Sequence, residues 1–279
     1  MTDTVTPQPA PEYALERTHR EYERLRVQAR FWQAATERVL DRLDLAAGAS
    51  CLDAGSGPGE VLRLLAERVG PTGRVTGIDV DAALNGLVEA DLHADGLTRC
   101  RTLTARLTGD TPVPGGPYDL VYARLLLFHL PERVPVLRRL WEAVAPGGHL
   151  LVQDYDLPSA TAVPTLPGVQ EVTRLFTETF TAVGCEVRAG LRLRELFASA
   201  GIGEPDDTDV AGRLVPLGTG GAPMLEQVLR SVLPAALAHG ITTEPAAEAA
   251  IAALRHEATE YADRTLLWPL LIGAWRRKH

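Results

Sequence analysis

The stretch Ala49-Ser-Cys-Leu-Asp-Ala-Gly-Ser-Gly-Pro-Gly-Glu60 decides the fold of this 279-residue chain. It is a short apolar run that ends in glycines at positions 55, 57 and 59, and a helical pattern follows. Glycine permits positive φ angles and lets a ligand approach the main chain closely. Pro58 suits the first turn of a helix, whose unpaired N–H groups face the end of the strand. The stretch therefore predicts a strand, a ligand-binding turn and a helix.

Further strand and helix patterns follow in the order expected of an α/β fold. Strand-like runs cover residues 50–54, 74–79, 118–123 and 149–154, and helical patterns cover 60–69, 81–94 and 132–145. This alternation is typical of a parallel sheet built from βαβ units. Beyond it we expect a loop or lid over 158–168, helices over 169–183, 191–200, 225–236 and 247–261, and strands over 210–217 and 265–275.

A long amphipathic helix is predicted before the first strand. Apolar or small residues recur at steps of three, four or seven from Tyr22 to Leu43. Such a helix can pack on the sheet or lie over the ligand site. In the second arrangement Tyr22 and Gln28 would close over the ligand, Gln28 by hydrogen bonding.

Composition narrows the function classes. The formal charge of -8 and the pI near 5.4 disfavour sequence-independent binding of nucleic acid. No apolar run is long enough to cross a bilayer, and residues 1–11 lack the apolar core of a secretory signal, so a cytoplasmic location is expected. The three cysteines are far apart and the histidines have no ligand-like spacing, so no metal site is predicted.

An acidic residue at the end of the second strand points to an adenosine-containing ligand. Asp79 is well placed to accept hydrogen bonds from two ribose hydroxyls, at the sheet edge where open α/β sheets bind ligands. A nicotinamide dinucleotide site expects G-x-G-x-x-G, whereas Gly55, Gly57 and Gly59 form G-x-G-x-G after Asp53. A carboxylate at Asp53 would oppose a pyrophosphate but could bind a cationic amino group. The pattern therefore favours S-adenosylmethionine (SAM).

Four segments of the chain resemble the successive motifs of class I SAM-dependent methyltransferases. They are Leu52-Asp-Ala-Gly-Ser-Gly-Pro-Gly59, Gly77-Ile-Asp-Val-Asp81, Tyr118-Asp-Leu-Val-Tyr-Ala-Arg-Leu-Leu-Leu-Phe-His129 and Leu137-Arg-Arg-Leu-Trp-Glu-Ala-Val-Ala-Pro-Gly-Gly-His-Leu-Leu-Val152. They are similar in particular to the small-molecule branch of bacterial specialised metabolism. The resemblance covers about residues 45–155, with the motifs in the family's order.

The resemblance implies a Rossmann-like class I fold with a mostly parallel seven-stranded sheet and an antiparallel closing strand. An N-terminal helix and an inserted helical cap would complete it. We expect an N-terminal cap over 1–44, a SAM-binding core over 45–157, a lid over 158–190, a core continuation over 191–221, a helical cap over 222–263 and a closing strand over 264–279.

The resemblance also implies roles for individual residues. Gly55 and Gly57 would lie beneath the methionine part of SAM, and Val80 would pack on adenine. Arg124 would stand near the methionine part or the substrate entrance. The family often places an Asp after the third strand to meet the adenine amino group, whereas here residues 105–108 read Ala-Arg-Leu-Thr and Asp110 comes slightly later.

Methyl transfer is an in-line displacement that depends mainly on alignment, and a base is needed only when the acceptor must lose a proton. His129, just past the fourth strand, is the first candidate base, and Asp154 and Tyr155 come next. We therefore expect SAM-dependent methylation of a small, natural-product acceptor at O, N or C, with S-adenosylhomocysteine (SAH) as product. A SAM-fold enzyme with another reaction, such as a cyclisation, and a non-catalytic SAM-binding module are the alternatives. The oligomeric state, a homodimer included, stays open.

Overall fold

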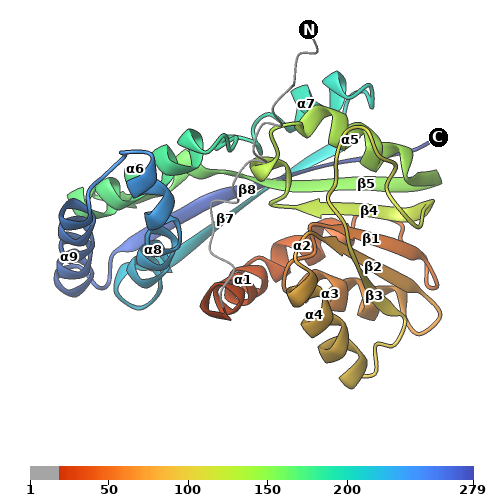
Figure 1. Cartoon of the computed structure of the whole chain (residues 1–279), viewed down its shortest axis with the longest axis horizontal. Helices are drawn as coiled ribbons and strands as arrows, with labels where there is room; N and C mark the ends of the chain where they lie inside the picture. The colour runs from red at the N-terminus through yellow and green to blue at the C-terminus, as the bar shows by residue number, and fades with distance from the viewer. Residues whose placement is uncertain (1–18) are drawn as a thin grey trace, which may run out of the picture.

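The computed structural model describes residues 19–279, and these residues form one mixed β-sheet of eight strands flanked by helices (Figure 1). The strand order is β3-β2-β1-β4-β5-β8-β6, with β7 paired to β8. The strands are β1 (Ser50–Ala54), β2 (Arg74–Asp79), β3 (Cys100–Thr104), β4 (Tyr118–Arg124), β5 (Val144–Asp156), β6 (Thr161–Val163), β7 (Asp207–Pro216) and β8 (Thr265–Arg277). β1 to β5 pair in parallel, and β8 is antiparallel to β5, β6 and β7.

Helices cover both faces of the parallel part of the sheet. Alternate residues of β1 point to opposite faces and pack against different helices. Cys51 packs in one apolar cluster with α2 (Gln33–Leu40), α3 (Glu60–Val69) and α4 (Ala82–Ala94). Leu52 and Ala54 pack in another cluster with α5 (Arg133–Glu142) and α7 (Leu193–Ser199). The sheet is therefore buried on both sides, as parallel sheets require.

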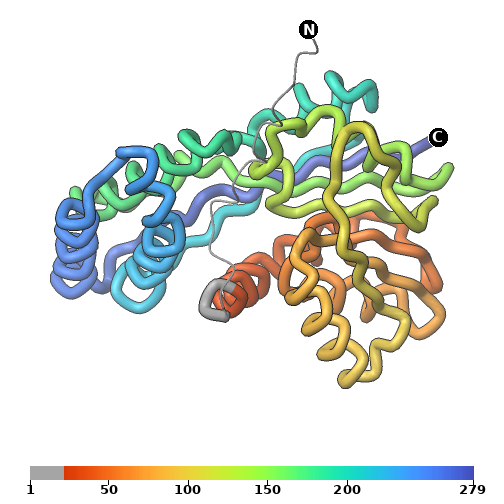
Figure 2. The backbone as a smooth tube through the Cα atoms, viewed as in Figure 1, coloured from red at the N-terminus to blue at the C-terminus, as the bar shows by residue number. Residues whose placement is uncertain are grey.

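A separate helical cap lies at one end of the sheet, where the long strands β7 and β8 extend beyond the core (Figures 1 and 2). It consists of α6 (Pro167–Ala182), α8 (Ala222–Ala238) and α9 (Glu244–Glu260). The apolar faces of these helices share one buried cluster with β6 and with the cap-side ends of β7 and β8. A short π-helical segment, η3 (Leu217–Gly221), joins β7 to α8. The division of the chain into six segments stays a prediction.

Three expectations about local structure were wrong. The helix expected over 22–43 is interrupted at Trp32, which separates α1 (His19–Phe31) from α2. Trp32 is fully buried, and its indole N–H is bonded inside the protein rather than facing solvent on a continuous helix. β6 lies in the stretch that was expected to be a loop, and it pairs with β8. The sheet therefore has eight strands, whereas seven were expected.

The third correction concerns β5, which begins at Val144 rather than at His149. Val144 pairs with Tyr118, and an irregularity in the register then accommodates the Pro-Gly-Gly segment that was expected to end a helix. None of the helices within residues 19–279 is long and apolar enough to span a membrane. Residues 1–11, in which no secretory signal was recognised, lie outside the described residues.

Candidate cofactor and acceptor site

A cavity of about 320 Å³ lies at the carboxyl ends of β1, β2 and β4, and side chains of the cap helices α6 and α8 also line it. The strand order reverses between β1 and β4, which is where open α/β sheets bind ligands. Most of the predicted site residues line this cavity: Tyr22, Gln28, Asp53, Gly55, Gly57, Asp79, Val80, Arg124, His129 and Tyr155. Asp110 and Asp154 do not line it.

The glycine turn forms the floor of the cavity between β1 and α3. Gly57 has φ +46°, and a Cβ there would meet no atom within 4 Å, because the position faces open space. Gly59 has φ +81°, and a Cβ there would lie 2.4 Å from Cγ1 of Val88 on α4. The turn therefore needs glycine at Gly59 because a Cβ would collide with Val88, and at Gly57 because of its positive φ.

Asp79 joins the glycine turn to the start of α4. Its Oδ2 accepts a hydrogen bond from Gly57 N (3.0 Å), and its Oδ1 accepts one from Asp81 N (3.1 Å). A carboxylate has about four lone-pair sites, so both oxygens can still accept bonds from a ligand. Val80 follows with a side chain that is 37% exposed. The apolar surface of Val80 and the carboxylate of Asp79 thus lie side by side on the cavity wall.

Asp53 is a buried carboxyl group without a full set of partners. Its side chain is 2% exposed, and no group within the described residues hydrogen-bonds to Oδ2. Burial raises the pKa of Asp53 to about 7; the nearby Arg124 guanidinium opposes this shift, and the Asp79 carboxylate adds to it. A buried carboxyl group with an oxygen that lacks a described partner, at the floor of a cavity, is suited to a cationic group of a ligand.

Arg124 is held in place by a buried polar network. Its Nη1 donates to Thr36 Oγ1 (3.1 Å), and Thr36 in turn donates to Gln153 Oε1 (3.0 Å). The Tyr122 hydroxyl donates to the same Gln153 oxygen (2.6 Å). Arg124 forms no ion pair with a described carboxylate. The network thus holds the guanidinium at the end of β4, near the Asp53 carboxyl group.

His129 lies on the short helix η1 (Leu127–His129) and is half-buried. Its ring stacks edge to face on Phe128 and Phe180, and its Nδ1 lies 3.8 Å from Cys185 Sγ. This apolar setting lowers the pKa of His129 to about 4 by desolvation, and the charge of Arg24 adds to the effect. The imidazole is therefore neutral at physiological pH and only weakly basic.

Asp154 and Asp110 lie elsewhere. Asp154 is fully buried, and its carboxylate accepts hydrogen bonds from the backbone N–H groups of Phe128 and Tyr155 (3.0 Å each). It therefore positions η1, and with it His129, from behind the cavity wall. Asp110 is exposed and accepts from Thr108 Oγ1 (2.6 Å). The cavity wall next to Val80 is formed instead by Ala105, Arg106 and Leu107.

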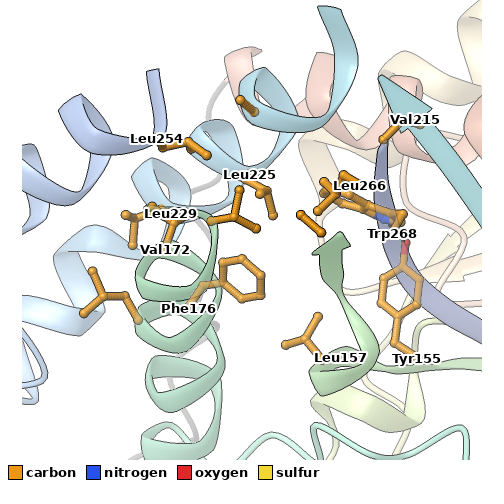
Figure 3. Close-up of a cluster of buried hydrophobic side chains, with 14 of the residues drawn as sticks. Tyr155, Leu157, Val172, Phe176, Val215, Leu225, Leu229, Leu254, Leu266 and Trp268 are labelled. Atoms are coloured by element: carbon orange, nitrogen blue, oxygen red, sulfur yellow. Dashed lines mark hydrogen bonds between the residues drawn. The ribbon is translucent and has the colours of Figure 1, made fainter. Parts of the chain in front are cut away.

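Tyr155, at the end of β5, receives three N–H donors at one phenol oxygen. They are Trp32 Nε1 (2.5 Å), Gln28 Nε2 (3.2 Å) and Trp268 Nε1 (3.4 Å). Figure 3 shows Tyr155 directed at Trp268. α1, the break between α1 and α2, and β8 thus converge on this hydroxyl.

Several cavity residues were not anticipated from the sequence. Trp268 was assigned only to the core or edge of the last strand. Trp32, which bonds to Tyr155 without lining the cavity, was assigned only to an apolar helix stripe. The cap contributes Phe176 and Phe180, which the helical period marks as apolar without indicating what they face. Ser56, within the glycine turn, has a buried Oγ without a described partner and also lines the cavity. Its place inside the turn is the one signal that could have identified it.

A comparison with protein families matches residues 20–201 to the model described as "Methyltransferase domain". The match includes the glycine turn, Asp79, Arg124, His129 and Tyr155, but it ends before the cap helices α8 and α9.

Curated relatives match part of the chain. Trans-aconitate 2-methyltransferase of Paracidovorax citrulli is 34% identical over 134 residues, which is 48% of this chain and 48% of that protein. Nocamycin O-methyltransferase of Saccharothrix syringae is 34% identical over 122 residues, or 43% of this chain and 42% of that protein. The chain thus spans about half the length of the curated relatives it matches.

A solved structure from Bacillus halodurans C-125 superposes with a TM-score of 0.60 at 13% identity, covering 87% of this chain and 97% of that chain. At this identity the likeness concerns the fold alone. It agrees with the strand order, with five parallel strands followed by an antiparallel one next to β5. The predicted fold class is therefore confirmed.

Proposed function

Since the chain belongs to the family of the methyltransferase domain, we propose that it transfers the methyl group of SAM to a small-molecule acceptor. The observation that carries the proposal is the convergence on one cavity of the open glycine turn, the buried Asp53 carboxyl group and the Asp79 carboxylate. An adenosine group, an amino acid group and a sulfonium need these three surfaces together. SAM is the methyl donor of the class I family, and SAH is its product.

SAM would lie along the carboxyl ends of β1 and β2. Asp79 would accept hydrogen bonds from the ribose hydroxyls, Val80 would pack on adenine, and the open surface at Gly57 would support the methionine part. Asp53 would pair with the cationic amino group. Arg124 lines the same cavity as Asp53 and Tyr155.

The main catalytic task of the protein is to align the acceptor atom with the methyl group of SAM. A nucleophilic atom of the acceptor attacks the methyl carbon in line with the departing sulfur, and the positive charge of the sulfonium is lost in the process. Holding the two reactants in line can supply several kcal/mol of the barrier reduction, about 7–11 in favourable intramolecular cases. The rigid β-strand ends and the cap would provide that alignment.

The acceptor would occupy the cap half of the cavity, where the walls are apolar. Leu157, Phe176, Phe180, Val228 and Trp268 line it. The two relatives reported above are named for small-molecule acceptors, and one of them for transfer to oxygen. These observations support a small organic acceptor. The proposal covers methyl transfer to an oxygen, nitrogen or carbon atom of that acceptor.

Two measurements test the proposed function. A ligand that binds only the folded state raises the melting temperature, so SAH should do so in a saturable way. A labelled methyl group from SAM should then appear in metabolites extracted from the organism that carries the gene. Absence of any SAH effect at millimolar concentration would refute the cofactor assignment. SAH binding without transfer to any metabolite would instead favour a SAM-binding protein with another role.

The proposed pairing of Asp53 with the amino group predicts a pH-dependent affinity. Because Asp53 has a pKa of about 7, SAH binding at lower pH must first remove a proton. The dissociation constant of SAH should therefore rise by up to about tenfold per pH unit below 7 and level off above pH 8. Calorimetry between pH 5.5 and 8.5 measures this dependence.

Asp53→Asn is the matched variant, since it keeps the size of the side chain and removes the titration. Its SAH affinity should be weaker than that of the wild type at pH 8 and nearly independent of pH. A raised folded-state pKa makes this group's contribution to stability largest below about pH 4, and that contribution falls as pH rises through about 7. The variant should thus be at least as stable as the wild type at pH 8. An unchanged pH profile in the variant would refute the pairing.

His129→Ala should slow turnover while SAH affinity stays within about twofold. General bases typically contribute 10²- to 10⁴-fold, but a base with a pKa near 4 has little driving force at neutral pH. We therefore expect a loss of no more than about tenfold in kcat, without a pH inflection near 6.5, and no loss for an acceptor that binds already ionised. Steady-state kinetics and calorimetry give both numbers. A lower melting temperature with normal kcat would instead identify His129 as a packing residue.

A further inference from the structure

The hydroxyl oxygen of Tyr155 accepts hydrogen bonds from protein groups, whereas its O–H has no acceptor among the described residues. A hydroxyl oxygen has two lone pairs and one O–H. Trp32, Gln28 and Trp268 direct three N–H groups at this oxygen. Among the described residues, no group accepts a bond from the Tyr155 O–H. Tyr155 can therefore serve a ligand as a donor, whereas it has no lone pair left with which to take up a proton.

The surroundings of this hydroxyl are apolar on the cap side. Figure 3 shows Leu157 and Phe176 pointing toward one another beside Tyr155 and Trp268. All four side chains line the cavity, and Tyr155 itself is only 7% exposed. A hydrogen bond made in such a place is stronger than one in water, because the local dielectric constant is low. The space favours an apolar molecule with one polar atom directed at Tyr155.

A guanidinium lines the cavity together with Tyr155. Arg124 lines the same cavity, its charge acts on Tyr155, and it has no ion-pair partner among the described carboxylates. The three N–H dipoles point toward the phenol oxygen and so polarise its O–H further. An anionic oxygen is the ligand atom best stabilised by a polarised donor and a guanidinium together.

The acceptor half of the cavity is also poor in bases. Tyr155 has no free lone pair, and Asp154 lies behind the wall with its oxygens on backbone N–H groups. The His129 ring packs edge to face against two phenylalanines. Because this burial lowers the pKa of His129 to about 4, the imidazole is too weak a base to deprotonate a weakly acidic acceptor at neutral pH. An acceptor that arrives already ionised avoids the need for a base.

We propose that the acceptor is an apolar oxygen acid that is ionised at neutral pH, such as a carboxylate, whose anionic oxygen binds between the Tyr155 O–H and Arg124. The inference rests on the proposed function and names its acceptor class. The oxygen attacks the methyl carbon, a C–O bond forms, and the S–CH₃ bond breaks with its electron pair going to sulfur. The negative acceptor and the positive sulfonium give a neutral methyl ester and neutral SAH, and no proton is transferred.

Three probes with one skeleton test the charge preference: trans-cinnamate, trans-cinnamamide and cinnamylamine. Calorimetry at pH 7.5, with and without saturating SAH, should show cinnamate binding at least about tenfold more tightly than the amide and the amine. Equal affinities, tighter binding of the amine, or no binding of cinnamate at millimolar concentration would overturn the proposal. SAH binding is measured separately, so its absence would refute the proposed function while the probe series still tests this inference.

Tyr155→Phe should reduce the preference for cinnamate over the amide by about tenfold, because only the O–H is lost. Val228→Ala is the control, since it changes the apolar wall and should weaken the three probes to a similar extent. An undiminished preference in Tyr155→Phe would assign the anion to another group and overturn the role of Tyr155. If Tyr155→Phe does not fold, because three buried N–H groups lose their acceptor, Arg124→Gln takes its place with the same expected loss of preference.

Discussion

Asp79→Ala is expected to lower the affinity for SAH by about 100-fold or more. Two charge-assisted hydrogen bonds to the ribose hydroxyls would be lost, each worth about 1.5–3 kcal/mol. The substitution also removes the acceptor for the backbone N–H groups of Gly57 and Asp81, so the glycine turn loses a contact that holds it to β2. Calorimetric titration with SAH measures the affinity, and thermal melting of the unliganded protein measures the stability separately.

Two further variants make this result specific. Asp79→Asn keeps one accepting oxygen and should lose less affinity than Asp79→Ala. Asp110→Ala removes an exposed carboxylate outside the cavity, so SAH affinity should stay within about twofold of the wild type. Unchanged affinity in Asp79→Ala would mean that the ribose lies elsewhere, whereas an equal loss in Asp110→Ala would point to a general effect of charge.

Alanine substitutions at Gly57 and Gly59 are expected to separate binding from stability. Gly59→Ala places a Cβ 2.4 Å from Val88 Cγ1 and forces a positive φ, so it should destabilise the fold by about 2–5 kcal/mol. Gly57→Ala meets no neighbour, so its cost should be about 1–2 kcal/mol from the φ angle alone. Gly57 lines the cavity, however, so a side chain there should weaken SAH binding by at least about tenfold.

Denaturant unfolding and SAH titration of both variants measure the two effects. Adding Val88→Ala to Gly59→Ala should recover part of the lost stability, because it removes the atom that the new Cβ approaches. The same addition to Gly57→Ala should bring no recovery. If Gly57→Ala bound SAH normally, the methionine part of the cofactor would not lie on this turn.

The features of the candidate site that the structure brings together as expected are local in sequence. The strand, turn and helix around Gly55 occupy about a dozen residues, and glycine spacing constrains the backbone there directly. Asp79 follows the next strand, and parallel strands bring their carboxyl ends to one edge of a sheet, so its approach to the glycine turn followed from topology. Asp53 was recognised as a carboxylate unsuited to a pyrophosphate, and the structure leaves one of its oxygens without a described partner.

The parts that could not be predicted depend on contacts between distant segments. Asp154 and Tyr155 are neighbours on β5, yet one side chain lies behind the wall and the other lines the cavity, because alternate residues of a strand point to opposite faces. At the break between α1 and α2, the indole of Trp32 bonds to Tyr155, which is 123 positions away in the sequence. The low basicity of His129 comes in part from packing against Phe180 on α6.

The sequence by itself determined the α/β fold, the ligand-binding edge of the sheet and the type of cofactor, because each depends on backbone conformation or strand order within a short stretch. Only the tertiary structure decided what the acceptor half of the cavity contains. Its walls are assembled from α1, β5, the cap helices and β8, and no local pattern specifies which side chains these elements bring together. The donors around Tyr155 and the position of Arg124, from which the acceptor class is inferred, belong to that second category.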